Sequence, residues 1–299
     1  MAVPDSCPAL EGIVRTAVEA ALQRDIALAA GLLRIFFHDC FPQGCDASVL
    51  LTGAGSEQQL GPNLTLQLVD DIRAQVHAAC GRTVSCADIA ALATRDAVAA
   101  SGGLSYAVPL GRLDSLAPAP SAAVLQLPSP TSGAAALVDA FRSRGLDAVD
   151  LVALSGAHTV GRARCGAFSD RFGEDGDFVR RLAANCSSDA GRLQELNVAT
   201  PDVFDNRYYE DLEKGQGVLS SDQALAGDWR TGWVVNGFAG NRWWFLGQFA
   251  QSMAKLGNLT GPGGNAGEIR RSCFVPSGQS VVLAAGASSA GDEGFLASA

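Results

Sequence analysis

The sequence predicts a protein built almost entirely of α-helices. Apolar residues recur with helical spacing along most of the chain, and strand-like alternation of apolar and polar residues is scarce. With 299 residues, 47% of them hydrophobic, the chain is long enough to bury a large core. These observations exclude a disordered or fibrous protein and indicate one domain or two closely packed lobes without an internal repeat.

Three helices are expected in the first half of the chain. Two follow each other directly, over 11–23 and 25–39, and the second is strongly apolar. A third is expected over 86–99, where Ser85 can accept a hydrogen bond from a free N–H of the first turn. Gly102 would end this helix because glycine tolerates the left-handed conformation found there.

A proline-rich stretch from Pro118 to Pro130 separates the two halves. Proline lacks a backbone N–H, so this stretch is not expected to form regular helix. Thr131 and Ser132 are predicted caps of the next helix, which would end before Gly145. Further helical segments are expected at 147–154, around His158, at 204–212 and across 232–256, the last of these rich in aromatic residues.

Charge and hydropathy exclude two classes of partner. The 31 acidic residues outnumber the 22 basic ones, and the Lys and Arg residues form no stripe that could follow a phosphate backbone. Apolar stretches are interrupted well short of the roughly 20 residues that a membrane span needs. We therefore expect neither nucleic acid nor a membrane as a partner.

Eight cysteines occur without a CxxC pair or a Cys/His cluster of zinc-site spacing. Four disulfides are the simplest interpretation, and eight buried thiols in a cytosolic protein are the alternative. Sequons at Asn185 and Asn258 favour a glycosylated, secreted protein. The first seven residues have neither the basic nor the apolar region of a signal peptide, which is the opposing observation.

Arg34 and His38 lie four residues apart on a predicted helix and therefore project from the same face. Their neighbours are Leu, Ile and Phe, and burying a guanidinium among them is costly unless it has a function or an anionic partner. A lone histidine on such a helix would more often be a core residue. The pair together indicates a functional site.

Two further patterns indicate polar functional groups: a loop rich in oxygen side chains and a second histidine. Asp39, Asp46 and Ser48 place oxygen side chains around a tight loop between two cysteines, which suits calcium, although a solvated acidic turn is the alternative. His158 is the second histidine of interest, and Asp222 is a candidate acceptor for its ring N–H. Sequence spacing alone does not pair these two residues.

Several motifs follow the order found in class III plant secretory haem peroxidases, and the chain resembles that family from about Cys7 to Cys273. A series of distinctive motifs in one order is far more specific than any single match. The motifs are LLRIFFHDCFPQGCDASVLL, GRTVSCADIAALATRDAV, VPLGRLDS, DLVALSGAHTVG, TPDVFDNRYYEDL, LSSDQAL and GEIRRSC.

The resemblance implies an all-α, two-lobed fold with a b-type haem (heme b) between the lobes. A single domain would span 1–273, with a distal lobe over about 1–130 and a proximal lobe over 131–273, and 274–299 would be a disordered extension. A buried salt bridge between Asp88 and Arg112 is also implied. The implied disulfides are Cys7–Cys80, Cys40–Cys45, Cys86–Cys273 and Cys165–Cys186.

The resemblance also implies the catalytic roles. His38 would be the distal base, which takes a proton from peroxide and returns it to the departing oxygen. Arg34 would stabilise the negative charge that develops as the O–O bond breaks. Asn63 would accept a hydrogen bond from the far nitrogen of His38 and fix its tautomer. Phe37 would form the apolar wall over the haem edge, and Pro128 would line the substrate entrance.

On the proximal side, His158 would be the axial iron ligand, and Asp222 would give it imidazolate character by accepting its Nδ1 proton. Two Ca²⁺ ions are implied as well. Asn197 replaces an expected aspartate, so the proximal ion is expected to bind more weakly than the distal one. The implied ligands are Asp39, Pro42, Gly44, Asp46 and Ser48 at the distal site, and Thr159, Asn197, Thr200, Val203 and Asp205 at the proximal site.

The expected protein is a monomeric haem peroxidase, secreted to the apoplast or sent to the vacuole. It would reduce hydrogen peroxide and oxidise small phenolic donors by one-electron steps. A protein that kept this fold and lost catalysis is the alternative, and the complete set of predicted catalytic residues argues against it. A hydrolase built on Ser155 is opposed by the lack of GxSxG and HExxH motifs and by a total of three histidines.

Overall fold

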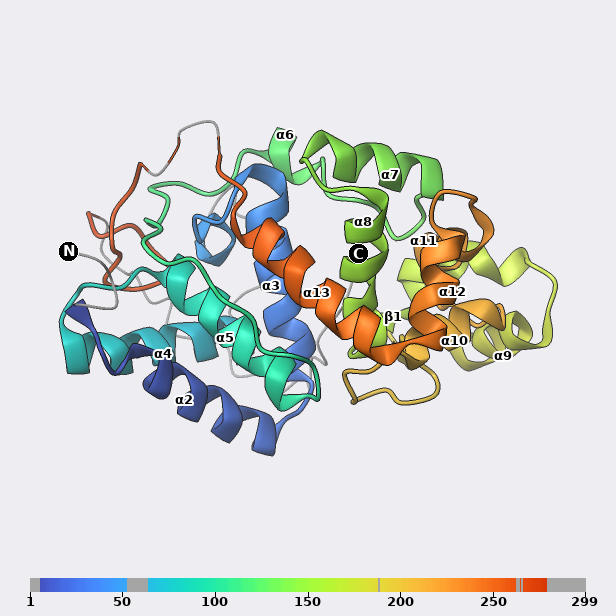
Figure 1. Cartoon of the computed structure of the whole chain (residues 1–299), viewed down its shortest axis with the longest axis horizontal. Coiled ribbons are helices and arrows are strands. Elements are labelled where there is room, and N and C mark those ends of the chain that lie inside the picture. Colours follow the sequence, from blue (N-terminus) through green and yellow to red (C-terminus); the bar gives the residue numbers. More distant parts are fainter. Residues whose placement is uncertain (1–5, 53–63, 188, 262–263, 265, 279–299) are drawn as a thin grey trace.

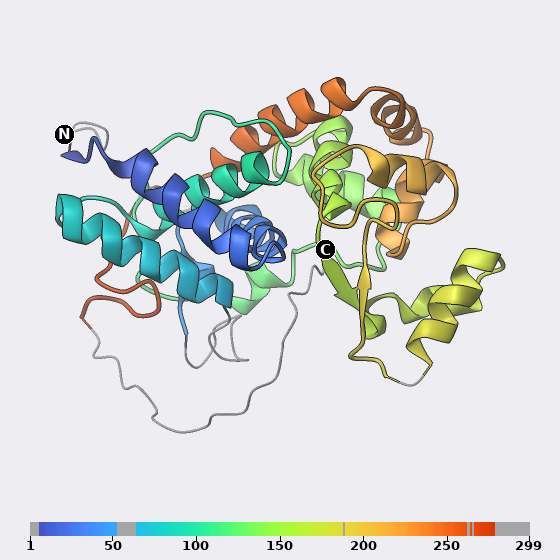
Figure 2. The ribbon, with the colours of Figure 1, turned by 90° about the horizontal axis from the view of Figure 1, so that it is seen from below.

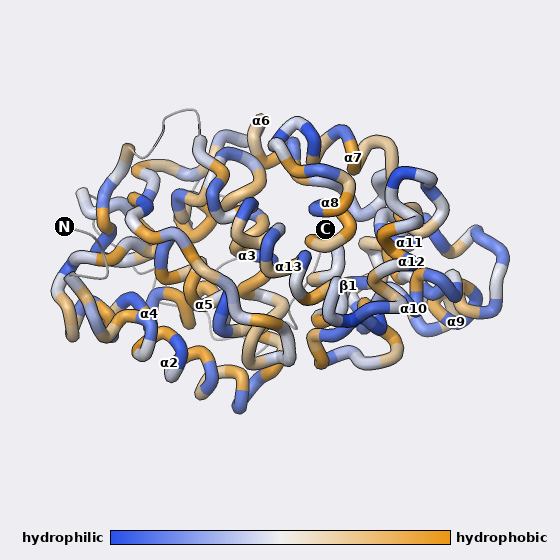
Figure 3. Tube along the Cα trace, in the orientation of Figure 1, coloured by the Kyte–Doolittle hydropathy of each residue, from blue (hydrophilic) through white to orange (hydrophobic). Residues whose placement is uncertain are grey.

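Amphipathic helices make up most of the described chain because apolar residues return every three to four positions. Figure 3 shows this as alternating hydrophobic and hydrophilic stretches along α2 (Leu10–Arg24). The computed structural model describes residues 6–52, 64–187, 189–261, 264 and 266–278. Within these ranges, strand structure is limited to β1 (Arg162–Arg164), which pairs antiparallel with β2 (Leu193–Glu195). The predicted all-α fold class is confirmed.

Helices of the first half surround one apolar core (Figure 1). Helix α2 packs on α5, and α5 packs on α3. Val14 and Val18 of α2 are fully buried in this core together with Ile72 and Val76 of α4. The remaining elements of this half are α3 (Leu28–Gln43), η1 (Ser48–Leu50), α4 (Leu64–Cys80), α5 (Cys86–Ala100) and α6 (Ser121–Val124).

Aromatic side chains fill the core of the second half. The rings of Tyr209 and Phe245 lie 4.9 Å apart, and those of Phe204 and Phe249 lie 4.7 Å apart. The Tyr209 hydroxyl donates to the carbonyl of Val152 at 2.8 Å and so ties α10 to α8. The elements here are α7 (Ala134–Ser143), α8 (Ala148–Ser155), η2 (Gly156–Thr159), η3 (Cys165–Gly173), α9 (Asp177–Cys186), α10 (Arg207–Glu213), α11 (Ser220–Gly227), α12 (Gly232–Gly240) and α13 (Arg242–Gly257).

Helix α3 belongs to both cores. Leu32 and Ile35 are buried in the first core, whereas Leu33 and Phe36 are buried in the second. Helix α13 packs on both α8 and α3, which joins the halves a second time (Figure 1). Figure 2 shows α9 at the opposite end of the molecule from α2, with the β1–β2 pair between α9 and the first half. The side chains of α3 between the two cores are therefore held rigidly.

Helix boundaries follow the predicted capping residues in some places and not in others. The Ser85 hydroxyl accepts from the Asp88 N–H, as predicted. The prediction for 131–132 is wrong, because α7 begins after Gly133 without a side-chain cap. The hydroxyl of Ser132 instead accepts from the N–H of Ser129, and the Thr131 hydroxyl contacts that of Ser129. These hydroxyls stabilise the turn before the helix rather than the helix itself.

Two segments are more helical than predicted. Helix α3 continues past Asp39 to Gln43 and contains Pro42, and the Gly44 N–H still donates to the Cys40 carbonyl at 2.9 Å. Proline has no backbone N–H, and Pro42 lies in the last turn of the helix, which ends at the next residue. The short helix α6 also forms within the proline-rich stretch, between its prolines.

The predicted disulfides are confirmed: Cys7–Cys80, Cys40–Cys45, Cys86–Cys273 and Cys165–Cys186 are all bonded. The segment after α13 returns to the first half, where Glu268 pairs with Asp114 and the Phe274 carbonyl accepts from the Thr52 N–H. The described residues just beyond Cys273 are therefore still hydrogen-bonded to the first half. None of the described helices is both long and apolar enough to cross a bilayer.

Candidate active site

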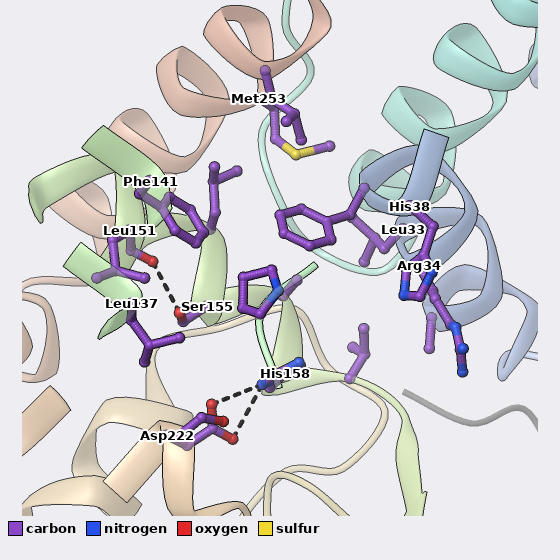
Figure 4. A pocket seen from close by; sticks show the side chains of 18 residues that line it. Leu33, Arg34, His38, Leu137, Phe141, Leu151, Ser155, His158, Asp222 and Met253 are labelled. Atoms are coloured by element: carbon purple, nitrogen blue, oxygen red, sulfur yellow. Dashed lines mark hydrogen bonds and ion pairs between the residues drawn. The ribbon is translucent and has the colours of Figure 1, made fainter. Parts of the chain in front are cut away.

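A cavity lies between α3, α8, η2 and α11, with Met253 of α13 on its rim (Figure 4). It contains about 820 Å³ of space free of protein atoms, part of it open to solvent. Most of its lining is apolar, and its few polar side chains come from opposite walls. Six predicted site residues line it: Arg34, Phe37, His38, Pro128, His158 and Asp222.

Helix α3 supplies the first wall. Arg34 and His38 are one turn apart on it, and both are partly buried at the cavity. The Phe37 ring stacks on Phe41 at 4.8 Å and on Phe141 at 6.2 Å between ring centroids. This stack fixes the aromatic surface beside His38 because interlocked rings have few alternative packings.

The facing wall presents His158, which η2 places directly after α8. Asp147 begins α8 with a capping box, in which its carboxylate accepts from the Asp150 N–H and the Asp150 carboxylate accepts from the Asp147 N–H. The cavity-facing end of α8 then runs into η2. The capping box fixes where α8 begins, and His158 follows the last residue of this short helix by three positions.

The imidazole of His158 is tied to a buried carboxylate. Its Nδ1 atom lies 2.9 Å from Oδ1 and 3.1 Å from Oδ2 of Asp222, and the Tyr208 hydroxyl donates to the same Oδ1 at 2.9 Å. Burial disfavours a charged imidazole, but the charge of Asp222 and its hydrogen bond outweigh burial and raise the pKa of His158. With its proton on Nδ1, the ring offers the lone pair of Nε2 to the cavity.

The residues present fit a haem group. The cavity is lined mostly by apolar side chains, as a large flat macrocycle requires. The imidazole of His158 could supply a nitrogen ligand to the iron of such a group. The Ser221 hydroxyl is buried at the cavity wall and has no hydrogen-bond partner among the described residues. An orphaned buried hydroxyl beside a cavity is what a missing ligand leaves behind.

The predicted distal calcium ligands gather at the end of α3. Asp39 accepts from the N–H groups of Ala47 at 2.8 Å and Val49 at 3.3 Å. The Gln43 amide donates to Asp46 Oδ2 at 3.1 Å and to the Ser48 hydroxyl at 3.3 Å. Burial, reinforced by the nearby charge of Asp46, raises the pKa of Asp39 to about 8.

Two backbone features complete this loop. The Pro42 carbonyl accepts a hydrogen bond from the Arg144 guanidinium. Gly44 has a φ of 96°, and a Cβ there would lie 2.5 Å from the Gly261 nitrogen, so only glycine fits. A cation would offset the repulsion between Asp39 and Asp46, and the oxygen-rich donor set fits calcium.

The predicted proximal calcium ligands also converge. Thr159, Thr200, Val203 and Asp205 contact one another within hydrogen-bonding distance. Asn197 is fully buried among them, and its side-chain nitrogen points at their oxygens. A nitrogen donor in this position does not fit a calcium site, in contrast to the distal loop.

Some site residues lie beyond what sequence reasoning or the structure describes. Asn63, the predicted partner of His38, lies outside the described residues. Sequence reasoning assigned no role to Tyr208 or Ser221. Tyr208 lies inside a family motif, but no spacing rule places its hydroxyl on Asp222.

Comparison with known proteins gives the same family throughout. Residues 14–241 match the family model described as Peroxidase. Peroxidase 12 from Arabidopsis thaliana is 45% identical over 93% of this chain and 82% of its own length. Cationic peroxidase SPC4 from Sorghum bicolor is 46% identical, with coverage of 90% and 79%. Peroxidase 22.3 from Oryza sativa subsp. japonica is 44% identical, with coverage of 90% and 88%. The chain therefore belongs to the class III plant peroxidase family and is a haem peroxidase.

Proposed function

We propose that the protein holds haem b through His158, reduces hydrogen peroxide in the cavity, and oxidises small phenolic donors by one-electron steps. One observation carries this proposal: the Arg34–His38 pair of α3 and the His158–Asp222 pair line the same cavity from opposite walls (Figure 4). When bound, haem supplies the redox centre at which peroxide is reduced.

His38 moves the proton in this reaction. Its neutral imidazole accepts a proton from one oxygen of peroxide and gives it to the other oxygen as that atom departs as water. This combined base and acid catalysis contributes about 10²- to 10⁴-fold in typical enzymes. Asn63 would orient the ring by accepting a hydrogen bond from its other nitrogen. Arg34, one turn earlier on α3, stabilises the negative charge on the departing oxygen.

His158 and Asp222 together would set the basicity of the nitrogen that holds the haem iron. A carboxylate that accepts the Nδ1 proton makes Nε2 more basic and so favours the oxidised state of a bound iron. The hydroxyl of Tyr208 holds the carboxylate in place from a second direction. The chain therefore controls both the position of the imidazole and its basicity.

The apolar rim of the cavity supports the proposed donor class. Pro128, Phe37, Phe141 and Met253 give it apolar walls, and part of it opens to solvent. Planar aromatic rings with one hydroxyl match such a surface better than charged or bulky donors. Small phenols are thus the proposed donors, with Pro128 at their entrance.

A calcium ion at the end of α3 is part of the proposal. It would link α3 to the loop that follows, because its ligands come from both. The residues that would hold it are Asp39, Pro42, Gly44, Asp46 and Ser48.

The proposed setting is secretory. Four disulfides need an oxidising compartment, which the apoplast or the route to the vacuole provides. A net charge of −9 disfavours nucleic acid, and we propose that the protein acts as a monomer without a membrane partner.

Visible spectroscopy and donor turnover test the function. The disulfide-bonded protein supplied with haem should show a Soret band that shifts on addition of peroxide, and it should then oxidise a phenol such as guaiacol. The His158→Ala variant is the control and should lose the native Soret position. A native Soret band without any turnover would favour the catalytically silent alternative. Absence of the band from the folded protein would overturn the proposal.

A further inference from the structure

Four oxygen atoms of two threonines surround the side-chain nitrogen of Asn197. The carbonyl oxygen and Oγ1 of Thr159 lie 3.2 and 3.0 Å from Nδ2. The same two atoms of Thr200 also lie 3.2 and 3.0 Å away. All four oxygens belong to residues predicted as calcium ligands. The amide nitrogen thus occupies the centre of an oxygen cage in which a cation would otherwise lie.

The orientation of this amide is fixed by its other end. Asn197 Oδ1 accepts from the backbone N–H of Ala199 at 3.1 Å and of Thr200 at 3.2 Å. A flipped amide would point its NH₂ group at these two donors and its oxygen at two carbonyls and at two hydroxyls whose hydrogens are directed to Val203 and Asp205. Every contact would then be repulsive. The NH₂ group must therefore face the cage.

The remaining polar groups of the cage are also satisfied without an ion. The Thr159 hydroxyl donates to the Val203 carbonyl at 3.2 Å, and the Thr200 hydroxyl donates to Asp205 at 3.0 Å. Each hydroxyl has used its hydrogen and so presents a lone pair to Asn197. The Asp205 carboxylate also accepts from the Arg207 N–H at 2.9 Å. Thr159, Thr200, Val203 and Asp205, all among the described residues, thus each have a hydrogen-bonding partner without an ion.

An aspartate at position 197 would behave differently. One carboxylate oxygen would keep the N–H groups of residues 199 and 200, and the second would point at four oxygens. That arrangement is stable only when a cation lies between them. The exchange of one oxygen for NH₂ replaces this need for a cation with hydrogen-bond donors.

We propose that the proximal site of this chain binds no calcium, and that the Asn197 amide replaces the ion as its structural link. The link connects Thr159, which directly follows His158, to the 197–205 segment. The proximal side is then independent of calcium, while the loop after α3 keeps a charged site. This inference does not depend on the proposed function, because ion content is measured without turnover.

Calcium content per chain tests the proposal. The holoprotein is equilibrated with calcium, exchanged into calcium-free buffer and analysed for retained metal. Native protein should retain one ion at most, and Asp46→Asn, the matched change at the distal loop, should retain none. Asn197→Asp should gain one ion over native protein. Two ions in native protein, or one in folded Asp46→Asn, would overturn the inference.

Thermal unfolding of Asn197→Asp provides a second test. In chelator, this variant should melt about 5 °C or more below native protein in the same buffer, because the new carboxylate faces four oxygens unpaired. Added calcium should restore most of the difference. If the variant is as stable as native protein in chelator, the cage tolerates a carboxylate without an ion, and the inference fails.

Discussion

The Nδ1 atom of His158 lies 2.9 Å from Oδ1 of Asp222, a contact that joins η2 to α11 across 64 residues of sequence. The Tyr208 hydroxyl donates to the same oxygen at 2.9 Å. The imidazole therefore has one orientation, and its basicity depends on a single buried carboxylate.

The Asp222→Asn variant should weaken this control. An amide can still accept a hydrogen bond from Nδ1, but it carries no charge, so the His158 imidazole would become less basic. We expect the reduction potential of bound haem to rise and the reaction with peroxide to slow by about 10- to 100-fold. Spectroelectrochemistry and stopped-flow absorbance measure these changes. Tyr208→Phe, which keeps the carboxylate, should shift the potential less, and equal shifts would contradict this account.

His38→Ala should slow the reaction with peroxide by about 10²- to 10⁴-fold or more while haem stays bound, because the proton can no longer be passed between the two oxygens. Arg34→Leu should slow it less, since it removes charge stabilisation alone. Stopped-flow rates at several peroxide concentrations provide the measurement. Native rates in both variants would exclude these roles.

The two disulfides at Cys86 and Cys40 should differ in their contribution to stability. Cys86–Cys273 closes a loop with a sequence separation of 187, whereas Cys40–Cys45 has a separation of 5. On the chain-entropy account, removal costs about 5 kcal/mol for the first and about 2 kcal/mol for the second. Denaturant titration of the two double-alanine variants compares them. A larger loss for the short loop would show that the local geometry after α3 matters more than chain entropy.

The ion pair between Lys255 and Asp150 should make stability depend on acid pH. Burial alone would raise the pKa of Asp150, but hydrogen bonds from Lys255, the Asp147 N–H and Ser252 hold that pKa below its ordinary value. A lowered carboxyl pKa contributes stability above the unfolded pKa of about 4, and this contribution is lost as pH falls through the folded pKa.

Lys255→Met should therefore lower the free energy of unfolding at pH 7 by about 1 to 2 kcal/mol, because Lys255 is half-exposed and solvent screens the pair. The difference from native protein should shrink below about pH 4. Lys214→Met is the control, since its ammonium lies 3.9 Å from Glu210 on the surface, and it should change stability little. A pH-independent loss would point to packing of the lysine stem instead.

Local signals in the sequence predicted much of the fold. Ser85 caps α5 as expected, because an N-cap hydrogen bond involves only neighbouring residues. The same reasoning was wrong for Ser132, whose hydroxyl stabilises a turn with Ser129. Both uses are local and similar in energy, so residue type alone does not distinguish them.

The spacing of residues in the sequence could pair only some of the site residues. Arg34 and His38 could be paired from helical periodicity, whereas the contact of His158 with Asp222 forms only when η2 and α11 pack together. The family resemblance supplied that pairing. For Asn197, the sequence predicted a weaker calcium site, but the direction of its amide depends on two backbone N–H groups of a turn that no residue pattern specifies.

The burial of Arg270 has a consequence for how the protein folds while it is being synthesised. Its side chain is fully buried, and its backbone N–H donates to the carboxylate of Asp114. The same carboxylate accepts from the first backbone N–H groups of α5. Arg270 is synthesised long after the helices of the first core. That core can therefore be completed only when most of the chain has been synthesised, and Cys86 can form its native disulfide only after Cys273 has been added. Early pairing of Cys86 with another cysteine would therefore trap a misfolded chain.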